Sequence, residues 1–228
     1  MMISMGLRLE TMPLFPLHTV LFPYAQIRLH IFEERYKEMI SECVEFEKPL
    51  GIVLIRSGDE VGSLAEPYLI GTAVHIEKVE YFNDGQLDIQ IIGERRFRIR
   101  ELDDSRNYLV GKVEPLIEHV IDEGNEPFAE SLFLQAREEF SLLVQKLFSR
   151  QEFKVQVVFP SDPMVLSFTI ANLLAMENLE KQRLLETTDT VERIQALIPL
   201  LQLQNMEMRR PKYQTVEMPE LEEWICSN

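Results

Sequence analysis

Histidines, cysteines and arginines are the residues of this chain whose chemistry could mark a site. The four histidines are His18, His30, His75 and His119. They lie far apart in the sequence and lack ligand spacing such as H-E-x-x-H, so packed or surface histidines are expected. Cys43 and Cys226 are too few for a disulfide framework or a four-thiolate zinc site. The sequence therefore predicts no metal and no cofactor.

Motifs for nucleotide and acyl-transfer chemistry are missing from the sequence. A phosphate-binding loop needs two glycines followed by Lys and a hydroxyl residue, and no such string occurs. No G-x-S-x-G turn offers a serine nucleophile. Adjacent carboxylates such as Glu33 with Glu34 are expected to be solvated charges rather than an acid and base pair. The chain is predicted not to be an enzyme. A hydrolase would need a pocket between its two halves with convergent polar groups.

The one local basic feature is the segment at residues 94–100. On a strand, Arg96, Arg98 and Arg100 would share one face. Contact with RNA and a ladder of cross-strand ion pairs are the two interpretations. The ladder is favoured because the chain carries a net charge of -15, which repels nucleic acid at long range. The expected partners of the arginines are neighbouring carboxylates such as Asp88, Glu77 or Glu80.

Composition indicates an ordinary globular protein. The 228 residues are 46% hydrophobic and 27% charged, enough for a core that needs no disulfide. Residues 1–10 lack the apolar stretch of a signal peptide, and no segment approaches the roughly 20 apolar residues of a membrane span. A cytoplasmic protein without membrane contact is expected.

Residues up to about 118 have the short or alternating apolar runs of strands. Ile27, Leu29 and Ile31 alternate with polar residues, and a continuous apolar run follows at residues 51–55. Asp84 with Gly85 supplies the turn of a tight hairpin. One helix is expected at residues 33–46, with an inward face formed by Tyr36, Met39, Ile40 and Cys43.

From about residue 125 the apolar spacing changes to three and four, which predicts helices. Asp162 stands at one expected helix start, and Thr188 or Asp189 at another. Pro199 should kink or interrupt the last helix. The resulting organisation is a flexible N-terminus (1–11), a β subdomain (12–120), an α-helical subdomain (125–208) and an acidic tail (209–228), which contains Trp224.

A family resemblance rests on an ordered series of motifs across residues 12–204. The motifs of the β half are Met12-Pro13-Leu14-Phe15-Pro16-Leu17, Val20-Leu21-Phe22-Pro23, Leu29-His30-Ile31-Phe32-Glu33-Glu34-Arg35-Tyr36, Gly51-Ile52-Val53-Leu54-Ile55, Gly71-Thr72-Ala73 and Gly93-Glu94-Arg95-Arg96-Phe97-Arg98-Ile99. Those of the helical half include Asp162-Pro163 and Glu180-Lys181-Gln182-Arg183-Leu184-Leu185-Glu186. In this order they resemble the N-terminal, substrate-binding domain of Lon proteases.

The resemblance implies an α+β fold in which a PUA-like β pseudobarrel precedes an α-helical bundle. It also implies a non-catalytic module that binds unfolded or misfolded polypeptide, as an adaptor for a separate protease or chaperone. The candidate peptide-binding residues are Pro23, Tyr24, Phe32 and Tyr36, unless they pack the helix onto the barrel. Tyr24 replaces the Gly usual in the family, which implies a less strained turn or an added surface aromatic. An RNA-binding PUA-like protein is the alternative, although the net charge makes nucleic acid an unlikely partner.

Overall fold

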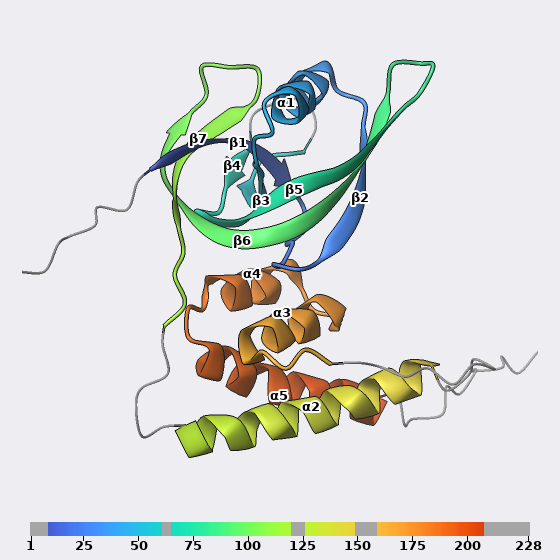
Figure 1. The fold of residues 1–228 in the computed structure, drawn as a ribbon, viewed down its shortest axis with the longest axis vertical. Helices are drawn as coiled ribbons and strands as arrows, with labels where there is room; N and C mark the ends of the chain where they lie inside the picture. Colours follow the sequence, from blue (N-terminus) through green and yellow to red (C-terminus); the bar gives the residue numbers. More distant parts are fainter. Residues whose placement is uncertain (1–8, 61–64, 120–125, 149–158, 208–228) are drawn as a thin grey trace, which may run out of the picture.

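The computed structural model of the protein describes residues 9–60, 65–119, 126–148 and 159–207. A part made of strands and one helix is stacked on a part made of helices alone (Figure 1). The chain completes the first part before it enters the second, so the two periodicities in the sequence correspond to two structural units. The predicted α+β fold is confirmed.

A ring of five strands forms a closed barrel in the first part. Their order is β1-β7-β6-β5-β3, and parallel pairing of β1 with β3 closes the ring. The other ladders of the ring are antiparallel. The strands are β1 (Glu10–Leu17), β3 (Leu50–Ser57), β5 (Ile70–Tyr81), β6 (Leu87–Asp103) and β7 (Leu109–Pro115); the short β4 (Glu66–Pro67) pairs with β3. This ring is the expected pseudobarrel.

The inside of the barrel is packed around the fully buried ring of Phe97. A Cβ at Gly51 would lie 2.8 Å from Phe97 Cζ, and a Cβ at Gly71 would lie 2.9 Å from the same atom. Glycine at these two positions therefore makes room for the ring. The surrounding core residues are Met12, Leu14, Val53, Ala73, Ile99, Leu109 and Val113.

Helix α1 (Glu34–Glu45) covers the end of the barrel away from the other helices (Figure 1). It buries Tyr36, Met39, Ile40 and Cys43, the positions predicted for its inward face. Their spacing places them on one side of the helix. They join a core that includes barrel residues Phe15, Leu17, Leu50, Ile52, Val74, Ile89, Ile91 and Val110.

Strand β2 (Gln26–Ile31) lies outside the ring and pairs with the first half of β6. Beside it, β5 and β6 extend beyond the barrel as a hairpin (Figure 1). Gly85 has a φ of 79° in the turn, and the N–H of Phe82 donates to the carbonyl of Gln86 at 2.9 Å. The predicted Asp-Gly hairpin is confirmed.

The second part contains α2 (Glu126–Phe148), α3 (Pro163–Leu173), α4 (Asn178–Glu186) and α5 (Thr190–Glu207). Asp162 Oδ1 accepts the N–H of Met164 at 2.8 Å, and Asp189 Oδ1 accepts that of Val191 at 2.7 Å, so both aspartates cap helices as predicted. Helix α5 continues through Pro199, and the predicted interruption is wrong. Burial of the neighbouring Leu197, Ile198 and Leu201 holds the helix together despite the lost hydrogen bond.

The helical part reaches the barrel through a shared apolar core. Phe22 and Phe168 face each other across the junction, with ring centroids 6.1 Å apart. Among the described helices, none has the length and apolarity to cross a membrane. The domain limits 1–11, 12–120, 125–208 and 209–228 stay predictions, and Trp224 in the tail lies outside the described residues.

Candidate functional site

Three aromatic rings gather where β2 ends beside the β5–β6 hairpin. The ring of His30 lies 6.4 Å from that of Phe32 and 6.2 Å from that of Phe82, centroid to centroid. Phe32 is 49% exposed and Phe82 is 44% exposed. We call these three residues the aromatic surface. Neighbouring exposed apolar rings that a core does not use are a feature of interaction sites.

A hollow of about 130 Å³ opens beside Phe32. Tyr36 lines it and stacks on Phe15, with ring centroids 4.3 Å apart. Its full lining is Phe15, Leu17, Leu29, His30, Ile31, Phe32, Glu33, Tyr36 and Glu60. Small-molecule pockets usually measure about 300–1,000 Å³. The hollow therefore has the size for one apolar side chain rather than for a cofactor.

His30 gives the aromatic surface a titratable group. Its Nδ1 lies 2.6 Å from Asp88 Oδ1, and its Nε2 lies 2.5 Å from the side-chain oxygen of Gln86. Both contacts favour the ring with two protons, because both partners are acceptors. The hydrogen bond to Asp88, followed by that to Gln86, raises the pKa of His30. The same His30 contact lowers the pKa of Asp88.

Strand β2 leaves one edge open. Its only ladder is with β6, and no other strand in the described part of the chain pairs with it. An open edge offers backbone N–H and C=O groups to another extended chain. This edge runs along residues 26–31 and ends at the aromatic surface.

The four predicted peptide-binding residues separate into two pairs. Phe32 and Tyr36 meet at the hollow, where Tyr36 is buried and Phe32 is exposed. Pro23 and Tyr24 lie before the other end of β2; Pro23 is buried and Tyr24 is 48% exposed. The six extended residues of β2 lie between Tyr24 and Phe32 and span about 17 Å. The two pairs therefore do not form one compact patch.

Tyr24 keeps the backbone conformation that glycine usually adopts. Its φ is 66°, and its N–H donates to the carbonyl of Gly93 at 2.7 Å. In this left-handed region, the backbone of any residue other than glycine is strained. The expectation of a less strained turn is therefore wrong, whereas the expectation of an added surface aromatic is confirmed.

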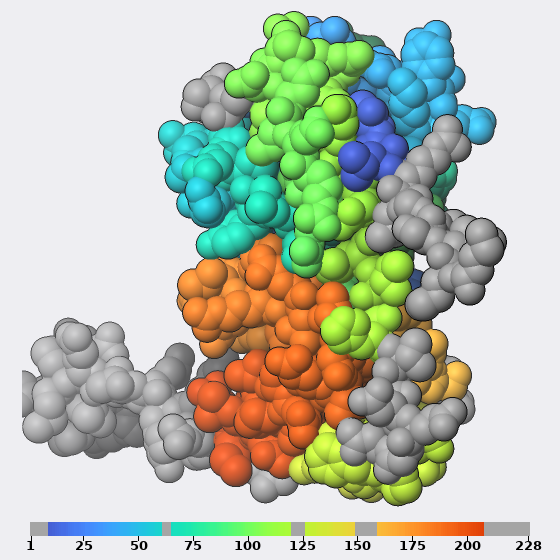
Figure 2. Space-filling model, turned by 90° about the vertical axis from the view of Figure 1, so that its left-hand side faces the viewer, coloured from blue at the N-terminus to red at the C-terminus, as the bar shows by residue number. Residues whose placement is uncertain are grey.

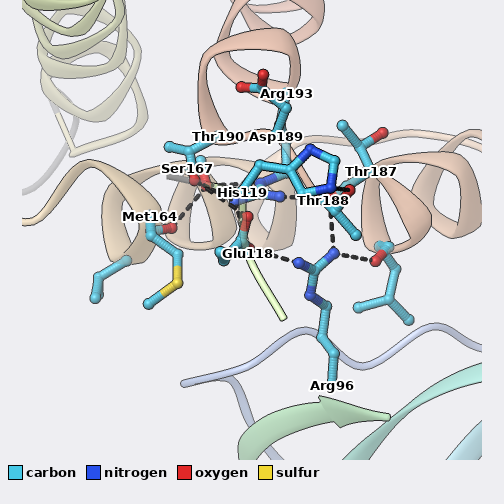
Figure 3. Close-up of polar contacts among 12 residues, drawn as sticks. Arg96, Glu118, His119, Met164, Ser167, Thr187, Thr188, Asp189, Thr190 and Arg193 are labelled. Carbon is cyan, nitrogen blue, oxygen red and sulfur yellow. Dashed lines mark hydrogen bonds and ion pairs between the residues drawn. The ribbon is translucent and has the colours of Figure 1, made fainter. Parts of the chain in front are cut away.

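A buried polar cluster joins the barrel to the helices (Figure 3). Arg96 of β6 donates to the carbonyls of Leu185 and Thr187, and to Glu118 Oε1, at 2.6 Å each. Arg193 of α5 donates to the same Glu118 oxygen at 3.0 Å and to the Thr187 carbonyl at 2.6 Å. One carboxylate thus holds two arginines, one from each part of the molecule.

Both guanidinium groups also lie close to the Phe168 ring. The Cζ of Arg96 is 5.2 Å from the ring centroid and that of Arg193 is 4.1 Å from it. Burial lowers the pKa of Arg96 to about 10 and also lowers the pKa of Arg193, while Glu118 opposes both shifts. Both arginines stay charged at neutral pH. Their donors are engaged within the protein, so the cluster (Arg96, Glu118, Phe168, Thr187 and Arg193), here the junction cluster, orients the two parts.

The expected partners of the basic strand are wrong. Arg96 pairs with Glu118, and Arg100 pairs with Glu114. Asp88 and Glu80 instead pair with Arg28 of β2, and Glu77 accepts a hydrogen bond from Gln26. The reason is the position of β2, which pairs with the first half of β6 and engages the carboxylates of β6 and of the neighbouring β5. The second half of β6 faces β7 and the helices.

Several residues of these sites escaped the sequence analysis. Phe82 could have been found from its place beside the predicted hairpin turn. Arg193 interrupts the apolar stripe of a predicted helix, which is a signal for a buried charge. All four histidines are exposed, and among the described residues no group of three or more His, Cys, Asp or Glu side chains could hold a metal.

The protein is a two-part α+β domain in which a closed barrel is fixed to a helical part. Its candidate binding surface is the open strand edge beside the exposed rings. The family described as the ATP-dependent protease La (LON) substrate-binding domain matches residues 11–202. The chain belongs to this family.

Two Lon proteases illustrate the likeness in sequence. The chain is 26% identical to that of Syntrophus aciditrophicus over 207 residues, 87% of this chain and 26% of the relative. It is 26% identical to that of Escherichia coli K12 over 193 residues, 83% of this chain and 24% of the relative. The chain thus spans about a quarter of the length of these proteases.

Two solved structures are similar to the fold. A Lon N-terminal domain protein from Xanthomonas campestris is 28% identical with a TM-score of 0.59, covering 83% of this chain and 98% of its own. The N-terminal domain of a Mycobacterium avium complex Lon protease has a TM-score of 0.60 at 19% identity, covering 85% and 98%. At the second identity the likeness concerns the fold alone.

Proposed function

We propose that this protein is a non-catalytic module that binds extended, unfolded polypeptide at the aromatic surface and along the open edge of β2. The observation that carries the proposal is the exposure of Phe32 and Phe82 beside an unpaired strand edge. Membership of a substrate-binding family supports the same class of ligand.

Two kinds of contact would act together in such a complex. An extended chain adds to a sheet edge through backbone hydrogen bonds, which are independent of sequence. Its alternate side chains then reach the same side of the sheet. One apolar side chain would enter the hollow beside Phe32, where Tyr36 and Phe15 form an aromatic lining. This combination favours apolar segments of many sequences, which folded proteins keep buried.

Membership of the family also suggests a cellular role for such a module. A module that holds unfolded chains serves as an adaptor in protein quality control when a separate protease or chaperone takes the chain over. Such a role needs no cofactor. The cytoplasm stays the predicted location. We do not propose the alternative of RNA binding, because these arginines are engaged within the protein. Arg96 is buried, Arg95 pairs with Glu10, and Arg100 pairs with Glu114.

The test is binding of a permanently unfolded, reduced and carboxymethylated model protein, measured by fluorescence anisotropy. The double variant Phe32→Ser/Phe82→Ser is expected to weaken binding about tenfold or more, since buried aromatic anchors dominate such interfaces. Leu134→Ser is the matched control, because Leu134 is a similarly exposed apolar residue (56%) on the helical part. Equal affinity of the double variant and the control would contradict the proposal.

Hydrogen exchange tests the strand edge separately. Backbone amides at residues 26–31 are expected to exchange more slowly when the unfolded protein is bound, whereas those of α4 should not change. Unchanged exchange in β2 would remove the strand edge from the proposal and leave the aromatic contacts. Capture of a protease or chaperone on the wild type, and its loss with the double variant, tests the adaptor role.

A further inference from the structure

A second and larger hollow lies on another face of the protein, where the barrel meets the helices. Its volume is about 510 Å³, within the usual range of ligand sites. Figure 2 shows the face on which residues 66–70 (teal), the second half of β6 (green) and the end of α4 (orange) meet. We call this hollow the arginine groove, after the three arginines in its lining, Arg56, Arg98 and Arg100.

Two of the three arginines have carboxylate partners. Arg56 pairs with Glu66, and Arg100 donates to Glu114 at 2.5 Å. Glu186, which also lines the groove, accepts a hydrogen bond from Gln182 at 2.8 Å. The lining therefore holds three positive and two negative side chains, although the chain as a whole carries a charge of -15.

Arg98 lacks a full set of partners. Its Nε is buried and has no hydrogen-bond partner among the described residues. A buried donor without an acceptor costs free energy, and native proteins usually supply one. Arg98 as a whole is only partly buried and lines the groove, so its terminal nitrogens can meet a ligand there. A carboxylate suits the guanidinium group best because it can accept two parallel hydrogen bonds.

The rest of the groove is apolar. Leu69 is 56% exposed and Leu102 is 43% exposed, and both line the hollow. Tyr68, Ile70 and Ile99 complete the apolar part of the lining. A ligand that fits this lining therefore combines a carboxylate with apolar side chains.

The arginine groove is separate from the aromatic surface. Ile99 lines the groove, whereas Ile89 lies on the stretch of β6 that pairs with the end of β2. Ten residues of strand place these two positions about 33 Å apart along β6. One short peptide segment cannot occupy both sites.

We propose that the arginine groove is a second binding site, which takes an acidic and apolar segment of a polypeptide. A carboxylate of the segment binds Arg98, and an adjacent leucine or aromatic side chain packs between Leu69 and Leu102. The inference deepens the proposed polypeptide-binding function, on which it rests, by adding a chemically different site. The net charge of the protein repels acidic peptides at long range, so selective binding of one requires a local site.

The test uses a fluorescein-labelled nonapeptide with a Leu-Glu-Phe-Leu-Glu centre and a twin in which Gln replaces both Glu. The full chain is expected to bind the acidic peptide at least about tenfold more tightly than the twin. Arg98→Met keeps an unbranched apolar stem, removes the guanidinium group and is expected to abolish this preference. Arg137→Met, at a similarly part-buried arginine of α2 outside both sites, is the matched control and should retain it.

A second variant distinguishes a loss of binding from a loss of fold, in case Arg98→Met does not fold. Leu102→Asp introduces a carboxylate at the exposed rim of the groove. It should weaken binding of the acidic peptide more than binding of the twin, and the circular dichroism spectrum of the variant should be unchanged. The proposal is overturned if the two peptides bind the wild type equally, if neither binds up to about 1 mM, or if Arg98→Met keeps the preference.

The unfolded model protein separates the two proposals. If Phe32→Ser/Phe82→Ser retains the acidic peptide and loses the unfolded protein, both sites are supported. If the wild type binds the acidic peptide with the stated preference but does not bind the unfolded protein, the proposal for the arginine groove is supported and the proposal for the aromatic surface is contradicted. The reverse result rejects the groove alone.

Discussion

The junction cluster and the aromatic surface differ in how their groups are partnered. At the junction, two buried arginines share Glu118 and the Thr187 carbonyl, and both lie close to the Phe168 ring. At the aromatic surface, Phe32 and Phe82 are about half exposed beside a strand edge that has no partner in the described part of the chain. The comparison indicates that the first region fixes the structure and the second is left available for binding. Substitutions should therefore affect stability in one region and affinity in the other.

Glu118→Gln should give the largest effect on stability. The change leaves Arg96 and Arg193 buried without their shared counter-charge, and breaking a buried ion pair costs about 3 kcal/mol or more. Urea denaturation followed by circular dichroism measures the unfolding free energy. Glu114→Gln is the control: its partner Arg100 is half exposed, so solvent screens the pair and the loss should be much smaller. Equal losses would remove the special role of the junction.

Glu42 tests a carboxylate of intermediate exposure, on the barrel end covered by α1. It accepts hydrogen bonds from Tyr108 at 2.7 Å, Lys48 at 2.9 Å and Arg106 at 2.8 Å. These contacts, the one from Tyr108 foremost, lower the pKa of Glu42 to about 2. Because the folded-state pKa is below the unfolded value of 4.5, the stabilisation is complete above pH 4.5 and is lost as pH falls towards 2.

Glu42→Gln should therefore lower the unfolding free energy at pH 7 by about 1 kcal/mol, a value reduced for solvent screening. It should also flatten the pH dependence of stability between about pH 4.5 and 2 relative to the wild type. Denaturation curves collected across this range provide the measurement. A variant with the same acid sensitivity as the wild type would show that Glu42 does not contribute.

Tyr24 tests whether the turn before β2 carries backbone strain. Tyr24→Gly and Tyr24→Ala both remove the ring, but only glycine adopts a φ near 66° without a steric cost. The glycine variant should be more stable than the alanine variant by about 1 kcal/mol, measured by thermal unfolding. Should alanine prove equally stable, the left-handed turn would not be strained.

Local chemistry accounts for what the sequence alone could predict. The hairpin turn at Gly85 and the caps at Asp162 and Asp189 depend on residues a few positions away, and all three are present. The inward face of α1 follows from helical spacing, which is also local. The family resemblance supplied the closed barrel, whose parallel pairing of β1 with β3 joins distant segments.

The candidate sites were harder to predict because they depend on pairings between distant segments. Arg96 meets Arg193 and Glu118 only after the helices dock on the barrel. Phe82 approaches His30 only because β2 pairs with β6 in one particular register. Tyr36 is of a residue type that is common in binding sites, yet it is buried against Phe15 and contributes only to the lining of the hollow.

The smallest expected effect concerns the proton on His30. Since the hydrogen bond to Asp88 is the main cause that raises the pKa of His30, Asp88→Asn should lower that pKa towards the ordinary value of 6.5. Any stabilisation from the raised pKa is complete below 6.5 and is lost as pH rises through the folded-state value. NMR titration of the imidazole gives the pKa directly, and Asp84→Asn, which removes only a weaker charge effect, is the control. An unchanged pKa in Asp88→Asn would mean that the aromatic surface does not hold a stabilised positive charge. A lowered pKa would show that Asp88 stabilises the positive charge of His30 at this surface, as Glu118 does for the arginines of the junction cluster.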